Sequence, residues 1–350
     1  MKSKALTKII VKKFIPTRSR SSKKGDNGKA LIVGGSYMYH GAPVLSSLAA
    51  LRTGTDLVYT AVPKNNVQST RSISPDLIVI PLADSKLTRG SVNKLLGQIP
   101  KDLDSATIGM GLAIQDIEAL KILVKSLLDM DVRLSLDASA LVKSILPLIK
   151  GKNVVVTPHS GEFYRLFGEE LPHDKKNHAK FIEKIAKKYS VTILLKGQTD
   201  IISDGKRTFQ NSKVDSSAMT VGGTGDVLSG IVSGLLARNR NSLQSAATAA
   251  YLNGLCGKYV QKEIGTHMVA SDLINALSEV EWKGNNPYAW IAGEFELMRF
   301  ARQLIKHEKS LPKDSMYLSC YWKIGADDPG MKKAKAALIL LDSLKNIFKF

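Results

Sequence analysis

The chain has 350 residues, of which 44% are hydrophobic and 23% are charged, enough for one large α/β domain with a small appendage. No stretch approaches the roughly 18 uncharged apolar residues of a membrane-spanning helix, so a membrane protein is not expected. Two cysteines are too few for a disulfide framework, and the six histidines lack the spacing of zinc ligands. We therefore expect a cytoplasmic protein without a metal site of its own.

The net charge of +19 is unevenly distributed, because residues 1–29 hold ten lysines or arginines and one acid, Asp26. Such a segment can be a nucleic-acid arm, a targeting peptide or a solvated basic face. It lacks the apolar region of a secretory signal, and the chain shows neither aromatic interleaving nor a nucleic-acid-reading motif. We expect a solvated face that attracts anionic small molecules, and no nucleic-acid partner.

Short runs rich in β-branched residues alternate along the chain with longer helical patterns. The expected strands are 30–33, 57–61, 77–81, 106–108, 133–136, 153–157, 192–195 and 200–203. The expected helices are 42–53, 115–128, 161–167, 177–189, 226–238 and 243–262. This alternation predicts an α/β fold with a mostly parallel central sheet and helices on both faces, in which ligands bind beyond the carboxyl ends of the strands.

The pattern changes near residue 282, where a turn cluster at 284–287 precedes a segment with aromatic residues and helical periodicity. In the last stretch, 329–350, the apolar residues fall on one helical face and most lysines lie elsewhere. We expect residues 285–350 to form a helical C-terminal extension of unknown role. Its terminal helix either packs on its own domain or contacts a subunit or partner.

Glycines and reactive side chains follow several expected strands, at 34–36, 109–111, Asp137, 157–159 and 196–197. This recurrence indicates one site assembled from many loops. The chain has no Walker A sequence, no G-x-G-x-x-G dinucleotide fingerprint and no G-x-S-x-G nucleophile elbow. Phosphate binding must therefore rest on another glycine-rich loop.

That loop lies within 219–230, where Gly222, Gly223 and Gly225 precede Asp226 and an apolar run with helical spacing. A glycine turn lets a ligand approach the backbone, and the N-terminus of the following helix attracts anions. A carboxylate beside bound phosphate is repelled, so Asp226 suggests a base that accepts a proton from a hydroxyl near a phosphoryl group. The alternative is a tight turn in which Asp226 only stabilises the helix start.

Four other positions could line the same cleft. Lys196 follows an apolar strand, where it could reach phosphate oxygens or be an ordinary surface charge. His159 could point into the cleft with Glu162, or be an ordinary loop histidine. Asp137 leaves a buried strand, which favours a function, and Ala42 lies at a helix start where its N–H could face a ligand.

Together these strings resemble the ADP- or ATP-dependent NAD(P)H-hydrate dehydratases of the ribokinase-like superfamily. The ordered matches lie at 24–28, 34–36, 41–43, 50–54, 61–63, 108–111, 137–138, 157–162, 196–197, 219–230 and 270–273. The resemblance implies a ribokinase-like domain over 12–281, preceded by a basic tail, 1–11, and followed by the extension 285–350. The epimerase domain that is fused to some members is missing.

The resemblance implies an enzyme of metabolite repair, a hydro-lyase that restores NADH or NADPH from the S-form of its hydrate. A nucleotide phosphorylates the hydroxyl of the damaged nicotinamide ring, and phosphate then leaves as the ring double bond returns. The implied co-substrate is ADP or ATP, with Mg²⁺ on its phosphates. The implied partner is an epimerase, present as a separate protein, and a homo-oligomer is compatible with the family.

By the same resemblance, Asp226 is the catalytic base, and backbone N–H groups of the glycine loop stabilise the transferring phosphoryl group. The residues implied to contact the hydrate are Ala42, Gly111, His159 and Asp226. The residues implied to bind the nucleotide are Lys196, Gly197, Gln198, Thr199, Asp200, Ser216, Ser217, Ala218, Met219, Thr220, Val221, Gly222, Gly223, Thr224 and Gly225.

The chain departs from the family pattern at Ser139, where an aspartate is common, at Ala113, where a glycine is common, and at 213–216. The preference for ADP or ATP, and for NADH or NADPH hydrate, stays open. So do two other functions. One is a ribokinase-like kinase of a small alcohol, such as a thiamin precursor, and the other is a non-enzymatic nucleotide-responsive or nucleic-acid-binding module. The strings at 41–43 and 157–162 favour the dehydratase.

Overall fold

The computed structural model describes residues 3–213, 217–280, 289–294, 300 and 316–322. The chain divides into two compact units, Met1–Val280 and Glu281–Phe350. This division lies where the sequence pattern changes. Within the described part, no helix is both long enough and apolar enough to cross a membrane.

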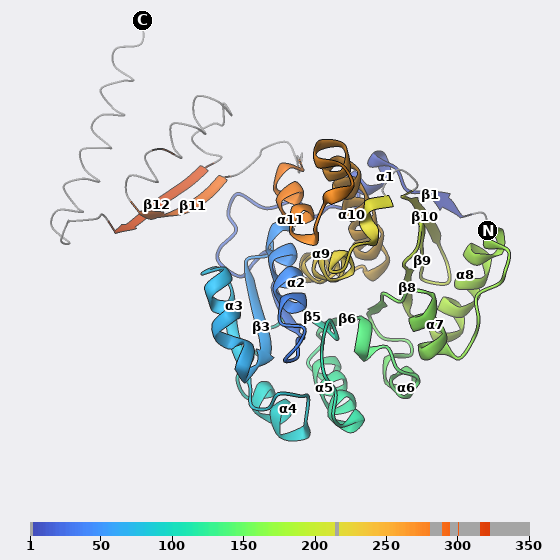
Figure 1. The fold of residues 1–350 in the computed structure, drawn as a ribbon, viewed down its shortest axis with the longest axis horizontal. Helices are drawn as coiled ribbons and strands as arrows, with labels where there is room; N and C mark the ends of the chain where they lie inside the picture. The colour runs from blue at the N-terminus through green and yellow to red at the C-terminus, as the bar shows by residue number, and fades with distance from the viewer. Residues whose placement is uncertain (1–2, 214–216, 281–288, 295–299, 301–315, 323–350) are drawn as a thin grey trace, which may run out of the picture. The chain divides into compact units, whose positions relative to one another are not determined.

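The larger unit is built on a ten-stranded sheet with the order β1-β10-β9-β8-β7-β6-β5-β2-β3-β4 (Figure 1). The strands are β1 (Lys4–Ala5), β2 (Lys29–Val33), β3 (Leu57–Pro63), β4 (Ile78–Leu82), β5 (Ser105–Ile108), β6 (Arg133–Leu136), β7 (Val154–Val156), β8 (Thr192–Leu195), β9 (Thr199–Ser203) and β10 (Thr208–Ser212). Only β9 runs antiparallel to its neighbours in this sheet. The strand order reverses between β2 and β5, and such a switch point opens a crevice at the carboxyl ends of the strands.

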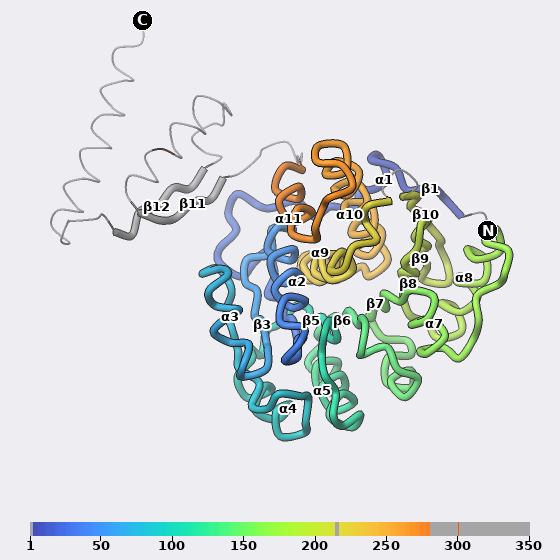
Figure 2. The backbone as a smooth tube through the Cα atoms, viewed as in Figure 1, coloured from blue at the N-terminus to red at the C-terminus, as the bar shows by residue number. Residues whose placement is uncertain are grey.

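Helices cover both faces of the sheet, as Figures 1 and 2 show. They are α1 (Lys8–Lys12), α2 (Gly41–Arg52), α3 (Val67–Ile73), α4 (Arg89–Leu96), α5 (Ile117–Asp129), α6 (Leu146–Ile149), α7 (Ser160–Phe167), α8 (His178–Tyr189), α9 (Thr224–Arg238), α10 (Ser242–Ile264) and α11 (Ala270–Glu279). Short 3₁₀ turns are η1 (Lys64–Asn66), η2 (Ala138–Ala140), η3 (Lys143–Ile145), η4 (Lys175–Asn177), η5 (Ser217–Thr220) and η6 (Gly265–His267). The expected α/β architecture is confirmed.

The side chains of β2 alternate between two apolar cores. Leu31 and Val33 belong to the larger core, which also holds residues of α4, α5, α7 and α8. Ala30 and Ile32 point to the opposite face, where they pack with Ala50 of α2 and residues of α9. Because β2 is buried on both faces, its sequence is a continuous apolar run, as is typical of a central parallel strand.

Helices α2 and α9 approach so closely that their backbones nearly touch. A Cβ atom on Gly230 would lie 2.0 Å from the carbonyl oxygen of Ser46, and one on Gly234 would lie 2.1 Å from Thr53 Oγ1. Glycine is therefore required on this face of α9. The contact fixes the N-terminal turn of α9 beside α2, where Ser46 Oγ donates to the carbonyl oxygen of Asp226 at 2.6 Å.

The eight strands and six helices expected from the sequence are present, with ends that differ by no more than two residues. The sequence does not predict β1, β10, α1, α3, α4, α6 or α11. Most of these elements are too short to show a periodic pattern. β1 pairs with β10, so residues Lys4–Ala5, expected in a basic tail, form an edge strand in the structure.

The smaller unit contains two strands that the sequence does not predict. β11 (Ala289–Glu294) and β12 (Met316–Trp322) pair in parallel, in a segment expected to be helical. Their runs are rich in aromatic and apolar residues, which are also compatible with strands. The helix expected over 329–350 lies outside the described residues.

Replacing Gly230 by alanine should lower the free energy of unfolding by about 3 kcal/mol or more, because the new methyl group must push α2 and α9 apart. Gly97→Ala is the matched control, since a Cβ there meets its nearest atom at 3.6 Å and the backbone is helical. It should change stability by less than about 1 kcal/mol. Urea denaturation measures both, and a Gly230→Ala protein as stable as wild type would contradict the close contact.

Candidate active site

The glycine loop ends at Gly223, where the backbone adopts a conformation that favours glycine. η5 leads into the loop, and α9 begins at Thr224 with Gly223 as its N-cap residue at φ +93°. A Cβ atom on Gly223 would lie 2.8 Å from side-chain atoms of Leu45 and Ala270. Thr224 Oγ1 donates to the carbonyl oxygen of Met219 at 2.9 Å, which secures the turn. The first N–H groups of α9 have no acceptor within the helix and are therefore available to an anion.

Asp226 lies in the first turn of α9, among charged side chains from other elements. Burial, and then the negative charges of Asp137 and Glu162, raise the pKa of Asp226 to about 7, although the Lys196 ammonium opposes this shift. A carboxyl group with this pKa is neutral about half of the time near pH 7, which suits a group that accepts a proton during a reaction. The raised pKa supports the prediction that Asp226 is the base.

A buried ion pair lies beside this carboxyl group. Asp137, which follows β6, accepts a hydrogen bond from Lys196 Nζ at 2.8 Å and another from Ser229 Oγ. Lys196 Nζ also lies 3.4 Å from Glu162 Oε2. Burial would raise the pKa of Asp137, but Lys196 and the hydrogen bonds hold it below its ordinary value. Burial would lower the pKa of Lys196, but the carboxylates of Asp137 and Glu162 raise it. Both partners therefore stay charged.

His159 is the N-cap residue of α7 and forms a capping box with Glu162. Its Nδ1 accepts a hydrogen bond from the N–H of Gly161 at 3.0 Å, and Glu162 Oε2 accepts one from the N–H of His159 at 2.9 Å. In the neutral ring, the proton must then be on Nε2. The side chain is 58% exposed, so this N–H can face a ligand.

The predicted hydrate contacts gather at the switch point. Gly111 follows β5 at φ +62°, and a Cβ atom there would lie 3.1 Å from the Cβ of Ala42. Ala42 lies one turn before Ser46 on α2, and Ser46 bonds to Asp226. Contacts between neighbours thus connect Gly111, Ala42 and the first turn of α9. His159 lies 3.6 Å from Glu162 Oε1, and Glu162 in turn contacts Lys196.

The first predicted nucleotide segment turns tightly after β8. Gly197 and Gln198 are exposed, whereas Asp200 is buried and accepts from the N–H of Gly197 at 3.1 Å and from Lys213 Nζ at 2.8 Å. Burial outweighs these contacts and raises the pKa of Asp200. The buried Asp200 side chain thus stabilises the turn through hydrogen bonds with the turn's own backbone and with Lys213. Ser216, also predicted to bind the nucleotide, lies outside the described residues, and the other members of its segment form η5 and the glycine loop.

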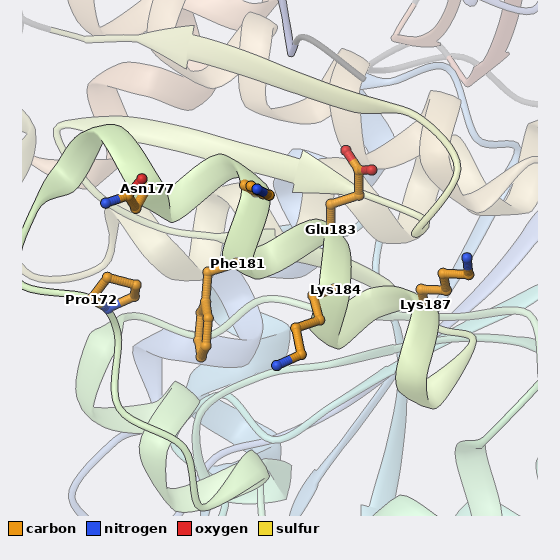
Figure 3. Close-up of a pocket in the computed structure, with 7 residues that line it drawn as sticks. Pro172, Asn177, Phe181, Glu183, Lys184 and Lys187 are labelled. Carbon is orange, nitrogen blue, oxygen red and sulfur yellow. The ribbon is translucent and has the colours of Figure 1, made fainter.

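A separate hollow of about 470 Å³ lies on the surface of α8. Figure 3 shows the ring of Phe181 and the side chain of Lys184 pointing to one side of the helix, near Pro172. Two more lysines, Lys180 and Lys187, line this hollow. It contains none of the residues predicted from the motifs, and its lysines fit a solvated basic face. We therefore place the active site at the strand ends.

Two contacts near the site escape a motif search. Ser229 donates to Asp137, and Ser46 donates to the backbone of Asp226. Ser229 lies one turn after Asp226 on α9, and Ser46 lies one turn after Ala42 on α2. Helical spacing from the predicted site residues could have found both serines.

The mostly parallel sheet and the glycine loop at the start of α9 define an α/β protein of the ribokinase-like class. The model of the NAD(P)H-hydrate dehydratase family matches residues 30–279. An ADP-dependent (S)-NAD(P)H-hydrate dehydratase of Nitrosopumilus maritimus (strain SCM1) is 64% identical over 280 residues, which are 80% of this chain and 97% of that relative. The chain belongs to the NAD(P)H-hydrate dehydratase family. This membership favours the dehydratase over the small-alcohol kinase and the non-enzymatic module.

Solved structures and longer relatives agree with this assignment. An ADP/ATP-dependent NAD(P)H-hydrate dehydratase from Bacillus subtilis, co-crystallized with ATP/Mg²⁺, superposes with a TM-score of 0.70 at 27% identity, covering 81% of this chain and 100% of that chain. A bifunctional NAD(P)H-hydrate repair enzyme of Pyrobaculum aerophilum is 41% identical over 266 residues, 75% of this chain but only 52% of the relative. A second model, of siderophore-interacting proteins, matches residues 245–325 and overlaps the end of the first match.

The raised pKa of Asp226 predicts a pH-dependent gain in stability for Asp226→Asn. The folded pKa, about 7, lies above the ordinary value of 3.8, so the wild type loses stability as pH rises from about 4 to about 7 and stays lower above that range. At pH 8 the asparagine variant should be more stable by roughly 2–4 kcal/mol, and at pH 5 by much less. Urea denaturation at both pH values measures the difference.

The control for this comparison is Asp131→Asn, at an exposed residue with φ +60°, a conformation that asparagine tolerates. Its effect should be small and equal at the two pH values. An equal effect of Asp226→Asn at pH 5 and pH 8 would show that the Asp226 pKa is not raised.

Removing one partner of the buried ion pair should lower the free energy of unfolding, and neutralising the other partner as well should restore part of it. Lys196→Met should lower the free energy of unfolding by about 3–5 kcal/mol, because Asp137 is left charged and buried. The double variant Lys196→Met/Asp137→Asn should recover more than half of this loss. Lys188→Met removes a more exposed pair with Glu169 and should leave the unfolding midpoint close to that of the wild type, because exposed ion pairs contribute little to stability. If the change in the free energy of unfolding of the double variant equals the sum of the changes of the two single variants, the pairing is contradicted.

Proposed function

We propose that this protein restores NADH or NADPH from the S-form of its hydrate, as an ADP- or ATP-dependent hydro-lyase. Membership of the family and 64% identity to a relative of that activity support the reaction. The observation in this structure that carries the proposal is the Asp226 carboxyl group, whose pKa of about 7 is combined with a place in the first turn of α9, directly after the glycine loop.

In the first step, Asp226 accepts the proton of the ring hydroxyl, and the hydroxyl oxygen attacks the terminal phosphorus of the nucleotide. The bond from that phosphorus to the bridging oxygen breaks. The leaving group is AMP when ADP is the donor, and ADP when ATP is the donor. The N–H groups of Gly223, Thr224 and Gly225 face the transferring group and stabilise its charge. Lys196 Nζ would lie 3.7 Å from a Cβ atom on Gly225, so its positive charge is beside this loop.

In the second step, the phosphorylated ring loses phosphate. Hydroxide is a poor leaving group, whereas phosphate is a good one. The neighbouring ring nitrogen supplies an electron pair as the carbon–oxygen bond breaks. The departing phosphate then accepts a proton from the next ring carbon, and the electrons of that carbon–hydrogen bond restore the double bond. Ala42 and Gly111 on one side and His159 on the other would hold the ring in place for this elimination.

Magnesium would enter with the nucleotide and neutralise charge on its phosphates. Among the residues that the structure describes, no group of three or more His, Cys, Asp or Glu side chains could hold a metal ion. Mg²⁺ commonly binds through substrate phosphates and one or two carboxylates. The nucleotide itself would lie between the turn at 196–200 and the segment 216–225.

We further propose that Met1–Val280 is the catalytic domain and that Glu281–Phe350 is a separate extension. The alignment with the bifunctional relatives spans about half of their length.

Purified protein with Mg²⁺, ADP and NADH hydrate should regain the absorbance of reduced nicotinamide, and ATP in place of ADP gives the nucleotide preference. The value of kcat/KM should rise with pH through about 7, as Asp226 ionises, and then level off. Asp226→Asn should lower kcat by about 10²–10⁴-fold without changing the affinity for ADP. No regain of absorbance with either nucleotide would refute the proposed function, and accumulation of a stable phosphoester would indicate a kinase instead.

A further inference from the structure

Three consecutive large side chains are exposed beside the active site. In the segment 36–40, between β2 and α2, Tyr37 is 79% exposed, Met38 is 76% exposed and Tyr39 is 61% exposed. Single apolar residues on a surface are common, but a run of three at the mouth of a crevice is informative. The catalytic steps above do not use them.

The base of this segment is anchored, so the exposure is a property of an ordered loop. Asn66 Nδ2 donates to the carbonyl oxygen of Ser36 at 2.7 Å, and the N–H of Tyr39 lies 3.3 Å from Ser36 Oγ. At the start of the loop, the N–H of Gly35 donates to the carbonyl oxygen of Met110 at 2.9 Å. The loop is therefore tied to the ends of both β3 and β5 while its aromatic side chains face outward.

A pocket of about 250 Å³ lies under the loop. Tyr39 and Ser36 line it together with Gly111, Ala113 and Ser139, which follow β5 and β6. A Cβ atom on Gly111 would lie 2.8 Å from the Cβ of Tyr39, so the tyrosine directly adjoins a predicted contact of the hydrate ring. Apolar and small polar groups line the pocket, as is typical of a site for a flat organic group.

The strand order shows which ligand can reach this pocket. The predicted nucleotide turn follows β8, whereas the pocket is lined by residues that follow β2, β5 and β6, on the other side of β7. The predicted hydrate contacts extend from His159, after β7, to Gly111, after β5, which lines the pocket, and to Ala42, after β2. The hydrate is a dinucleotide, so its second half must continue beyond the ring. The side toward the nucleotide turn is taken by ADP or ATP, and the free direction leads to the pocket.

We propose that Tyr37 and Tyr39 form a stacking platform for the adenosine half of the dinucleotide substrate, with the pocket at Gly111 and Ser139 beside it. This inference rests on the proposed function and deepens it by placing the part of the substrate that does not react. Aromatic side chains bind a nucleobase by its flat face, which requires no hydrogen-bond match. They would supply binding energy far from the reacting carbon and so help to hold the ring near Asp226.

The test compares KM values for two substrates, NADH hydrate and the hydrate of reduced nicotinamide mononucleotide, which lacks the adenosine half. Tyr39→Ala and Tyr37→Ala/Tyr39→Ala should raise KM for NADH hydrate roughly 5- to 50-fold. They should leave the values for the mononucleotide hydrate and for ADP within about twofold. Tyr39→Phe, which keeps the ring, should stay close to wild type. Tyr164→Ala removes an exposed aromatic ring from α7, and as the control it should leave KM for NADH hydrate unchanged.

Equal effects on the two hydrates, a rise in KM for ADP instead, or no effect on any substrate would overturn the inference while leaving the proposed function intact. A change of oligomeric state on light scattering with unchanged KM values would assign the tyrosines to a subunit contact and would also overturn it. A wild-type protein without turnover of NADH hydrate would instead refute the proposed function. Unfolding midpoints confirm that each variant is folded before its kinetics are read.

Discussion

The chemistry of this site depends on the balance of charge around one carboxyl group. Burial raises the pKa of Asp226 most, the negative charges of Asp137 and Glu162 raise it further, and Lys196 limits the rise. With fewer negative neighbours, the pKa of Asp226 would be lower, and the carboxylate would be a weaker acceptor for the proton of the ring hydroxyl in the proposed reaction. Without Lys196, three carboxyl groups would share a poorly solvated space with no positive charge of the protein between them. The buried pair of Lys196 and Asp137 therefore adjusts the proton affinity that burial gives to Asp226.

The fold brings these charges together from distant parts of the chain. Asp137 follows β6, Glu162 lies in α7 and Lys196 follows β8, so parallel neighbouring strands deliver them to the same edge of the sheet. Asp226 comes from the other layer, at the start of α9. The glycines that let α9 lie against α2 fix its position, and Ser46 bonds to its first turn. A small displacement of α9 would move the base and the anion loop together.

Much of this arrangement could be predicted from the sequence, because buried parallel strands and long helices have distinct periodic patterns. The glycine loop and Asp226 predicted a phosphoryl site only together with the motifs at the other strand ends, because such a loop alone is also compatible with a tight turn. The role of Asp137 was harder to see, since the sequence shows that it leaves a buried strand but not that Lys196 and Ser229 bind it. Likewise Asp200 is inside its turn, bound to Lys213, which its place in a nucleotide motif did not reveal. Such contacts depend on side chains that meet only after folding. The strands β11 and β12 escaped because an aromatic-rich apolar run fits either element.

The most direct test of the account is the ionisation of Asp226 itself. Carboxyl carbon NMR of protein labelled at aspartate, with Asp226→Asn to assign the signal, follows this group through a pH titration. Asp226 should show a midpoint near pH 7 in the folded protein, and a lower midpoint when Asp137 is replaced by asparagine. A midpoint close to 3.8, the ordinary value for an aspartate, would contradict the claim that its neighbours make Asp226 a base.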